Sequence, residues 1–119
     1  MEKVNLAEKF SKFSDPYNPR IIGEINNVYV KVVKCAGEFG WHHHDVEDEL
    51  FLVNKGKLTM KLRDGDVVLN PGEFIIVPHG VEHSPVGEND CEIVLIEPNT
   101  TLNTGNVENE LTRKTLERI

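Results

Sequence analysis

The amino-acid sequence predicts an all-β fold, built as an antiparallel sandwich or barrel. Val and Ile together number 22 of the 119 residues and Ala only two. Branched side chains of this kind favour pleated sheets, whereas helical domains use Ala freely. Short apolar runs are also separated at close intervals by turn-forming pairs such as Asn26-Asn27, Asp64-Gly65 and Pro71-Gly72. Strands of this length and spacing are typical of antiparallel all-β domains.

The apolar runs give the expected strands in chain order. Lys55-Gly56 and residues 88–90, which read Glu-Asn-Asp, are interpreted as turns between neighbouring strands. The strands are expected over residues 21–25, 28–35, 50–53, 57–62, 66–69, 73–77 and 92–97. Phe51, Met60 and Phe74 lie on these runs and are expected in the core.

A short helix is expected at each end of the chain. At the start, Asn5 caps a segment in which Leu6, Phe10 and Phe13 share one face. Near the other end, Val107, Leu111, Thr115 and Leu116 follow helical spacing. We therefore expect a barrel domain over residues 20–98, with residues 1–19 as an N-terminal helical appendage and 99–119 as a C-terminal tail containing the second helix.

Composition excludes several classes of protein. The formal net charge is −7, with 13 basic and 20 acidic residues and no cluster of Lys and Arg, which argues against nucleic acid or an anionic membrane as a partner. The longest unbroken aliphatic or aromatic runs have four residues, whereas a membrane span needs about 20.

The first ten residues contain no apolar signal region, so a cytoplasmic location is expected. Cys35 and Cys91 are too few for a disulfide framework and are expected as free, buried thiols.

All five histidines lie between positions 42 and 83, in two clusters. Side chains at i and i+2 of a strand point to one side, so His42 and His44 can reach one ion while His43 points away. Glu49 opens an apolar strand, where a carboxylate should be paired or metal-bound, and His83 opens the strand after a Pro-Gly turn. Three imidazoles and one carboxylate suit a borderline divalent ion. The alternative is surface histidines on hairpins, or imidazoles paired with the neighbouring acids.

These residues resemble the two sequence motifs of the cupin superfamily. The first motif, G(x)5HxH(x)3–4E(x)6G, is matched by Gly37, His42, His44, Glu49 and Gly56, with Gly37 one residue closer than the pattern asks. The second, G(x)5PxG(x)2H(x)3N, is matched by Gly72, Pro78, Gly80 and His83, while Gly87 replaces the final Asn. The spacer of 15 residues between Gly56 and Gly72 resembles the shortest of the family.

The resemblance implies a double-stranded β-helix, or jelly roll, with one divalent metal ion inside the barrel. Carried over to this chain, it makes His42, His44, Glu49 and His83 the metal ligands, and it leaves open whether the ion is Fe, Mn, Ni, Zn or Cu. The chain looks most like single-domain cupins described as mannose-6-phosphate isomerase-like, although it lacks an evident set of basic side chains to bind a phosphate. Fold alone does not set function.

Two functions follow as hypotheses. One is a metal-dependent enzyme on a small polar or carbonyl substrate, either sugar isomerase-like or dioxygenase-like. The other is a non-catalytic module that binds or senses a small molecule or metal, since no second catalytic group is evident and no catalytic residue is assigned.

Two further residues near the motifs have alternative interpretations. Trp41 either packs against the barrel or stacks on a substrate, and His79 is either a surface residue or a base near the ligands. Residues 49–53 are apolar on both strand faces, which predicts a homodimer.

Overall fold

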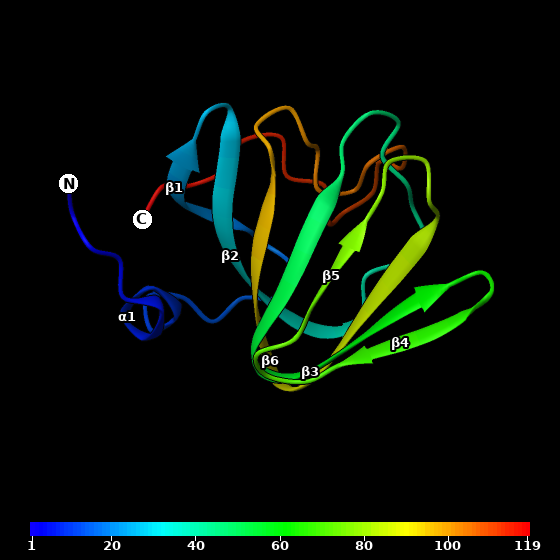
Figure 1. Ribbon diagram of the computed structural model, residues 1–119, viewed down its shortest axis with the longest axis horizontal. Helices are drawn as coiled ribbons and strands as arrows, with labels where there is room; N and C mark the ends of the chain where they lie inside the picture. The colour runs from blue at the N-terminus through cyan, green and yellow to red at the C-terminus, as the bar shows by residue number, and fades with distance from the viewer.

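The structure is a computed structural model that describes all 119 residues, and it confirms the all-β prediction. All strand pairs are antiparallel and form one sheet in the order β1-β2-β6-β3-β4, with β5 paired to β3. The sheet curls around an enclosed interior (Figure 1). The elements are α1 (Leu6–Phe10), β1 (Arg20–Ile25), β2 (Val28–Glu38), β3 (Glu49–Leu62), β4 (Gly65–Leu69), β5 (Phe74–Val77) and β6 (His83–Pro98).

The two longest strands, β3 and β6, bend where turns were expected. Lys55-Gly56 lies within β3, and residues 88–90 lie within β6, so both predicted turns are wrong. The β3–β6 register shifts on either side of Lys55, and Gly56 has a φ of 78°. A Cβ at Gly56 would lie 2.5 Å from the backbone oxygen of Asn89. Glycine therefore permits a bulge at which both strands bend together. A glycine with positive φ is also typical of hairpin turns, which is why the sequence indicated a turn here.

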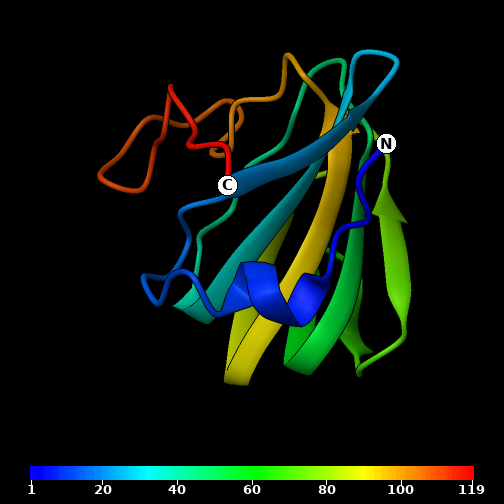
Figure 2. The same cartoon turned by 90° about the vertical axis from the view of Figure 1, so that its left-hand side faces the viewer.

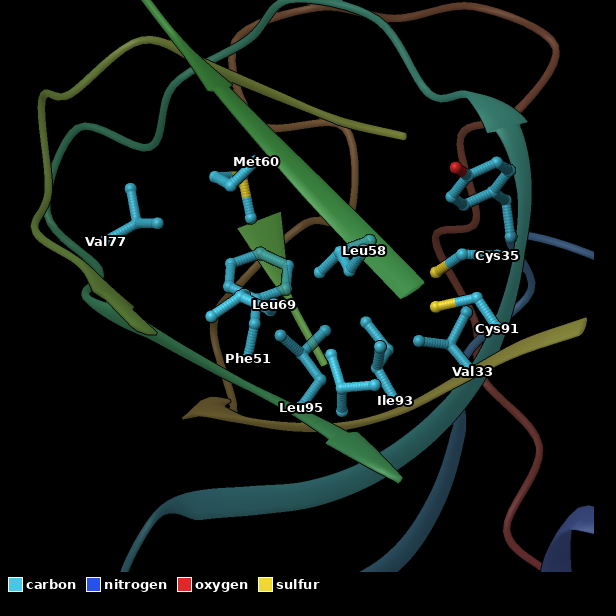
Figure 3. Packing of buried hydrophobic residues seen from close by; sticks show 12 residues of the cluster. Val33, Cys35, Phe51, Leu58, Met60, Leu69, Val77, Cys91, Ile93 and Leu95 are labelled. Carbon is cyan, nitrogen blue, oxygen red and sulfur yellow. The ribbon is translucent and has the colours of Figure 1, made fainter. Parts of the chain in front are cut away.

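Inward-facing side chains of the strands form the main core. Period-two alternation brings Phe51 and Val53 of β3 to the same side as Ile93 and Leu95 of β6. Met60 is fully buried as predicted, whereas Phe74 is 58% exposed and is not a core residue. Figure 3 shows this cluster, whose buried members are Tyr17, Val33, Cys35, Phe51, Val53, Leu58, Met60, Leu69, Val77, Cys91, Ile93 and Leu95.

The predicted N-terminal helix is present and covers part of the outer face of the sheet. Asn5 caps it by accepting a hydrogen bond from the backbone N–H of Glu8 at 3.0 Å. Phe10 packs against Val32 of β2 and Val94 of β6 in a second apolar cluster. Figure 2 shows α1 lying across these strands. The helix is only five residues long, so none of the structure's helices has the length and apolar character needed to cross a membrane.

The second helix, expected around Val107–Leu116, does not form, and turns occupy this segment instead. The Asn103 side chain donates to the backbone oxygen of Leu111 at 2.9 Å and accepts from the backbone N–H of Arg113 at 2.8 Å. Asn109 likewise accepts from the N–H of Leu111 at 2.8 Å. Asparagine side chains thus take up backbone groups that a helix would pair internally, and the helical spacing of the apolar residues is overridden.

The C-terminal segment crosses one end of the barrel and returns to β1. Asn106 donates its backbone N–H to the backbone oxygen of His43 at 3.0 Å, which ties the segment to the first histidine cluster. The chain then ends beside Ile21, which donates to Glu117 at 2.9 Å and accepts from Ile119 at 3.1 Å (Figure 1). We call residues 99–106 the cover segment, because they close the end of the barrel where the histidines lie.

Candidate metal centre

Glu49, the first residue of β3, projects into the barrel and is only 3% exposed. Its direction follows from the alternation that also turns Phe51 and Val53 inward. The β3–β6 register pairs Leu50 with Ile96, so its continuation by one residue places Glu49 opposite Glu97. A carboxylate at this depth needs charged or hydrogen-bonding partners to remain ionised.

His42 and His83 are held side by side by the backbone. They form an isolated antiparallel bridge in which His42 donates to the oxygen of His83 at 3.0 Å and His83 donates to that of His42 at 2.9 Å. Their ring centroids lie 4.3 Å apart. The Nδ1 atom of His42 lies 3.0 Å from the Gly40 carbonyl, and that of His83 lies 2.9 Å from the Val81 carbonyl. A carbonyl only accepts, so each Nδ1 carries the proton and each Nε2 keeps a free lone pair.

His44 completes the group from the same side of the chain as His42. Its backbone oxygen accepts from the N–H of Gly80 at 2.7 Å, which links the two histidine clusters. Its Nε2 lies 2.9 Å from Oε1 of Glu49. His43 between them points outward, where its Nε2 lies 3.0 Å from Asp45, as the alternation of side chains predicts.

The structure thus brings together all four residues singled out in the sequence. His42, His44, Glu49 and His83 are at most 4% exposed, and one potential ligand atom from each lies within 4.8 Å of all the others. The Nε2 atoms of His44 and His83 and the Oε1 atom of Glu49 are buried without any hydrogen-bond partner, although Oε1 lies 2.9 Å and 3.2 Å from the two nitrogens.

Unpartnered polar atoms at this depth are costly unless something else satisfies them. Three atoms that approach one another without forming hydrogen bonds are the arrangement expected of donors aimed at a shared cation. Three imidazole nitrogens and one carboxylate oxygen form a donor set that suits a borderline divalent ion. The group could therefore hold one metal ion.

A second buried carboxyl, Glu97, lies against Glu49 and was missed in the sequence. Its Oε1 atom lies 2.7 Å from Nζ of Lys31, and both side chains are essentially inaccessible. Burial and the facing Glu49 carboxylate raise the pKa of Glu97 well above its usual range. Burial also opposes ionisation of Glu49, but contact with Glu97 and with the two imidazoles outweighs it and holds the pKa of Glu49 well below its usual range. The two carboxyls therefore share one proton, carried by Glu97.

The alternation of β2 and β6 contained the signal for this pair. Lys31 has the strand parity of Val33 and Cys35, and Glu97 has that of Ile93 and Leu95, so both follow inward-facing residues. In the β2–β6 register Glu97 pairs with Tyr29, which puts Lys31 on the neighbouring diagonal. Charged residues at inward positions of two paired strands mark a buried ion pair.

A small cavity adjoins His42 and Glu49. Its volume of about 40 Å³ is room for a few water molecules. Apolar side chains such as Phe39, Phe51 and Ile93 form most of its wall, and Asn103 reaches it from the cover segment. Burial, followed by repulsion from His83, lowers the pKa of His42 to about 4, so its imidazole is neutral at neutral pH. A neutral imidazole is the form that coordinates a metal.

The other residues singled out in the sequence lie outside this group. The imidazole of His79 is 59% exposed and its Nδ1 lies 2.8 Å from the Asp48 carboxylate, which places it at the surface. Trp41 is half-buried, with the guanidinium of Arg63 stacked 3.7 Å above its ring. Cys35 and Cys91 are free and buried, as expected.

Known proteins share both this fold and its sequence pattern. A family model described as a cupin domain matches residues 28–109. The chain belongs to the cupin family. This cupin is similar to the "Uncharacterized protein YdbB" of Bacillus subtilis (strain 168), with 35% identity over 79 residues. That match covers 66% of this chain and 64% of the relative, so the cupin spans less than two thirds of the length of that protein.

Solved structures agree with the assignment. A cupin-2 domain containing protein from Shewanella frigidimarina is 43% identical and has a TM-score of 0.78, over 80% of this cupin and 93% of that chain. A protein from Neisseria meningitidis is 32% identical and has a TM-score of 0.73, over 82% and 99% of the two chains. A hydroquinone 1,2-dioxygenase from Sphingomonas, solved with 4-hydroxybenzoate bound, shares the fold alone at 17% identity and a TM-score of 0.66.

Proposed function

We propose that this cupin binds one divalent metal ion through His42, His44, Glu49 and His83 and acts as a metal-dependent enzyme on a small polar or carbonyl substrate. The observation that carries the proposal is the trio of buried, unpartnered atoms on His44, Glu49 and His83. Backbone carbonyls of Gly40 and Val81 already orient the imidazoles of His42 and His83, which lowers the cost of assembling the site.

When bound, the ion would supply Lewis-acid or redox chemistry at an oxygen of the substrate. The residues of the chain would orient and shield that oxygen. The apolar wall around Phe39, Phe51 and Ile93 keeps bulk water away, and the Asn103 amide can hydrogen-bond a polar group. A volume of about 40 Å³ holds only a few water-sized groups, so the cavity would take the reacting end of a substrate and not a whole sugar or catechol. Sugar isomerase-like and dioxygenase-like reactions both remain alternatives.

Metal binding is tested by elemental analysis of freshly purified protein and of alanine variants. His42→Ala and His83→Ala should lose most of the bound metal, because each removes a converging nitrogen. His43→Ala and His79→Ala are matched controls, since both imidazoles lie outside the group beside carboxylates. Stoichiometric metal retained in the His42, His44 and His83 triple variant would overturn the ligand assignment. Elemental analysis would also identify the ion among Fe, Mn, Ni, Zn and Cu.

Activity is tested by loading the protein with Fe(II), Mn(II) or Zn(II) and screening sugars, sugar phosphates and catechols. Turnover that depends on the metal and disappears in His83→Ala supports the enzymatic proposal. Failure of every metal with every substrate class, in protein shown to hold metal stoichiometrically, would count against it.

A non-catalytic binding or sensing role is the second candidate. It is favoured by the cavity wall, which contains no Asp, Glu, His or Lys other than His42 and Glu49 and so offers no separate carboxylate, imidazole or amine for proton transfer. Thermal shifts against a metabolite panel separate the two roles. A ligand that raises the melting temperature and is recovered unchanged supports binding without chemistry.

We also propose that the cupin is a homodimer. Phe74 and Ile76 of β5 are 58% and 53% exposed, and Val68 of the neighbouring hairpin is 48% exposed. Apolar side chains gathered on one edge of a sheet are typical of a protein–protein contact. Leu52 is packed against the cluster beneath α1, which accounts for part of the two-faced apolar character of β3. Sedimentation that shows only a 13.5 kDa species would rule the dimer out.

A further inference from the structure

The two cysteines of the chain lie side by side on neighbouring strands of the sheet. Cys35 of β2 and Cys91 of β6 are directly opposite in the antiparallel register, and they are 4% and 1% exposed. Figure 3 shows their sulfur atoms next to one another, both directed into the core. Neither belongs to the group of metal-ligand candidates.

Directly opposite residues in an antiparallel pair have Cα atoms about 4.5 to 5.5 Å apart. Disulfides accept Cα separations of about 4.4 to 6.8 Å. The register therefore already places Cys35 and Cys91 within bonding range, and an S–S bond requires side-chain rotation without a shift of either strand.

Glycine holds the backbone close around this pair. A Cβ at Gly87 would lie 2.5 Å from Cβ of Cys35, and one at Gly56 would lie 2.8 Å from Cα of Cys91. No other residue fits at these two positions without displacing a cysteine. The two glycines therefore keep the backbones of both cysteines packed closely against neighbouring residues.

A surface hollow lies on the outside of the barrel beside the two cysteines. Its volume is about 290 Å³, and both cysteines form part of its wall. Lys34 and Lys55 also line the hollow, together with Asp90. Both side chains belong to the core and are at most 4% exposed, so a small oxidant in the hollow reaches sulfur when the strands open locally. Glu92 also lines the hollow, and its charge raises the pKa of Cys91, against the lowering by contact with Cys35.

The two thiols differ in acidity. Contact with Cys35 lowers the pKa of Cys91, while contact with Cys91, followed by burial, raises the pKa of Cys35 well above its usual range. Because the thiolate is the nucleophile, Cys91 is the residue that attacks first and Cys35 the one that resolves the product.

We propose that Cys35 and Cys91 form a reactive dithiol that reduces a small hydroperoxide entering this hollow and closes to a cross-strand disulfide. The Cys91 thiolate attacks the terminal oxygen of the hydroperoxide and the O–O bond breaks, which forms sulfenic acid on Cys91. The departing oxygen takes up the proton that the Cys91 thiol released on ionising, and alcohol or water leaves. Cys35 sulfur then attacks the Cys91 sulfur, the S–O bond breaks, and water leaves with the Cys35 proton. Two electrons pass from the sulfurs to the peroxide, and an external dithiol reverses the oxidation.

Hydrogen peroxide is the probe for this reaction, used on the full chain and on His83→Ala. The variant separates thiol chemistry from oxidation by bound metal, so the outcome does not depend on the proposed function. After treatment, the protein is unfolded with an alkylating agent and its mass is measured. Both proteins should escape alkylation at both cysteines, lose about 2 Da by forming the disulfide, and regain both reactive thiols after reduction with dithiothreitol.

Single variants assign the roles. Cys35→Ser should stop at a sulfenic acid on Cys91 that a dimedone probe traps, whereas Cys91→Ser should leave Cys35 open to alkylation and slow its oxidation about tenfold or more. A peptide map of the oxidised wild-type chain checks the cross-link independently of how well the variants fold. Two thiols that remain fully alkylatable in excess peroxide, or a disulfide that joins two chains instead of residues 35 and 91, would overturn the proposal.

Discussion

The Nζ atom of Lys31 lies 2.7 Å from Oε1 of Glu97, and neither side chain reaches solvent. Together with Glu49 they form a row of charged groups across three neighbouring strands, β2, β6 and β3. Since Glu49 and Glu97 share one proton, the ammonium of Lys31 balances the remaining negative charge. The row therefore links the candidate ligand Glu49 to a counter-charge inside the barrel.

Lys31→Met should destabilise the fold by about 3 to 5 kcal/mol, because it leaves the single negative charge of the buried Glu49–Glu97 pair without its cation. Urea unfolding followed by circular dichroism measures the loss. The matched variant combines Lys31→Met with Glu97→Leu, which removes the ammonium together with the carboxyl that it contacts, at similar volume, and should recover part of the stability. A single variant as stable as wild type would show that the pair does not matter for folding.

Acid should destabilise the metal-free protein in a defined pH window. The pKa of His42 is lowered to about 4 in the folded state and is about 6.5 when the chain is unfolded, so the unfolded chain binds the proton more tightly. Stability therefore falls as pH drops from about 6.5 to about 4, by about 3 kcal/mol from this residue alone, and His42 causes no further loss below that.

Chemical unfolding at successive pH values measures this slope. His42→Gln should flatten it between pH 4 and 6.5, because glutamine does not titrate. An equal slope in wild type and His42→Gln would contradict this account.

Gly105→Ala should displace the cover segment from the candidate metal centre. A Cβ there would lie 2.2 Å from the His43 oxygen and 3.2 Å from Cδ2 of His42. Gly72→Ala is a matched control, because Gly72 also has a positive φ but has no atom within 4 Å of an added Cβ. Both should lose about 1 to 2 kcal/mol from backbone strain, but only Gly105→Ala should also weaken metal affinity. Calorimetric titration with Zn(II) measures the affinity.

Divalent metal should stabilise the folded chain. At a free concentration about 100 times the dissociation constant, the gain is about 2.7 kcal/mol, seen as a higher melting temperature. His83→Ala should abolish the shift and His79→Ala should retain it, because the imidazole of His83 belongs to the group and has an unpartnered nitrogen, whereas that of His79 lies outside it beside Asp48. A melting temperature that is insensitive to every divalent metal would contradict the metal-binding proposal.

Much of the fold and the grouping of the four candidate ligands could be predicted from the sequence. Period-two alternation determines which side chains of a strand face inward, so Glu49 and the pair His42 and His44 could be oriented without coordinates. Bringing His83 to them required the motif spacing, because alternation within one strand carries no information about a residue in another part of the chain.

The errors have local physical causes. Gly56 adopts a positive φ that is shared by hairpin turns and bulges, and the choice between them depends on the close backbone of Asn89, which no local pattern reveals. In the C-terminal segment, the side-chain hydrogen bonds of Asn103 overrode helical spacing. Lys31 and Glu97 were missed because each lies in a run that reads as ordinary strand.

The shared bends of β3 and β6 have a consequence for how relatives of this chain can diverge. Side chains change face with every residue of a strand, so deleting one residue between Glu49 and Leu62 would turn Glu49 outward or break its alignment with His83. The Arg63-Asp64 hairpin lies beyond that interval and can lengthen freely. Natural insertions should therefore accumulate at the tip of this hairpin, while the distance along β3 from the carboxylate to the corner stays constant in every lineage that keeps the four candidate ligands.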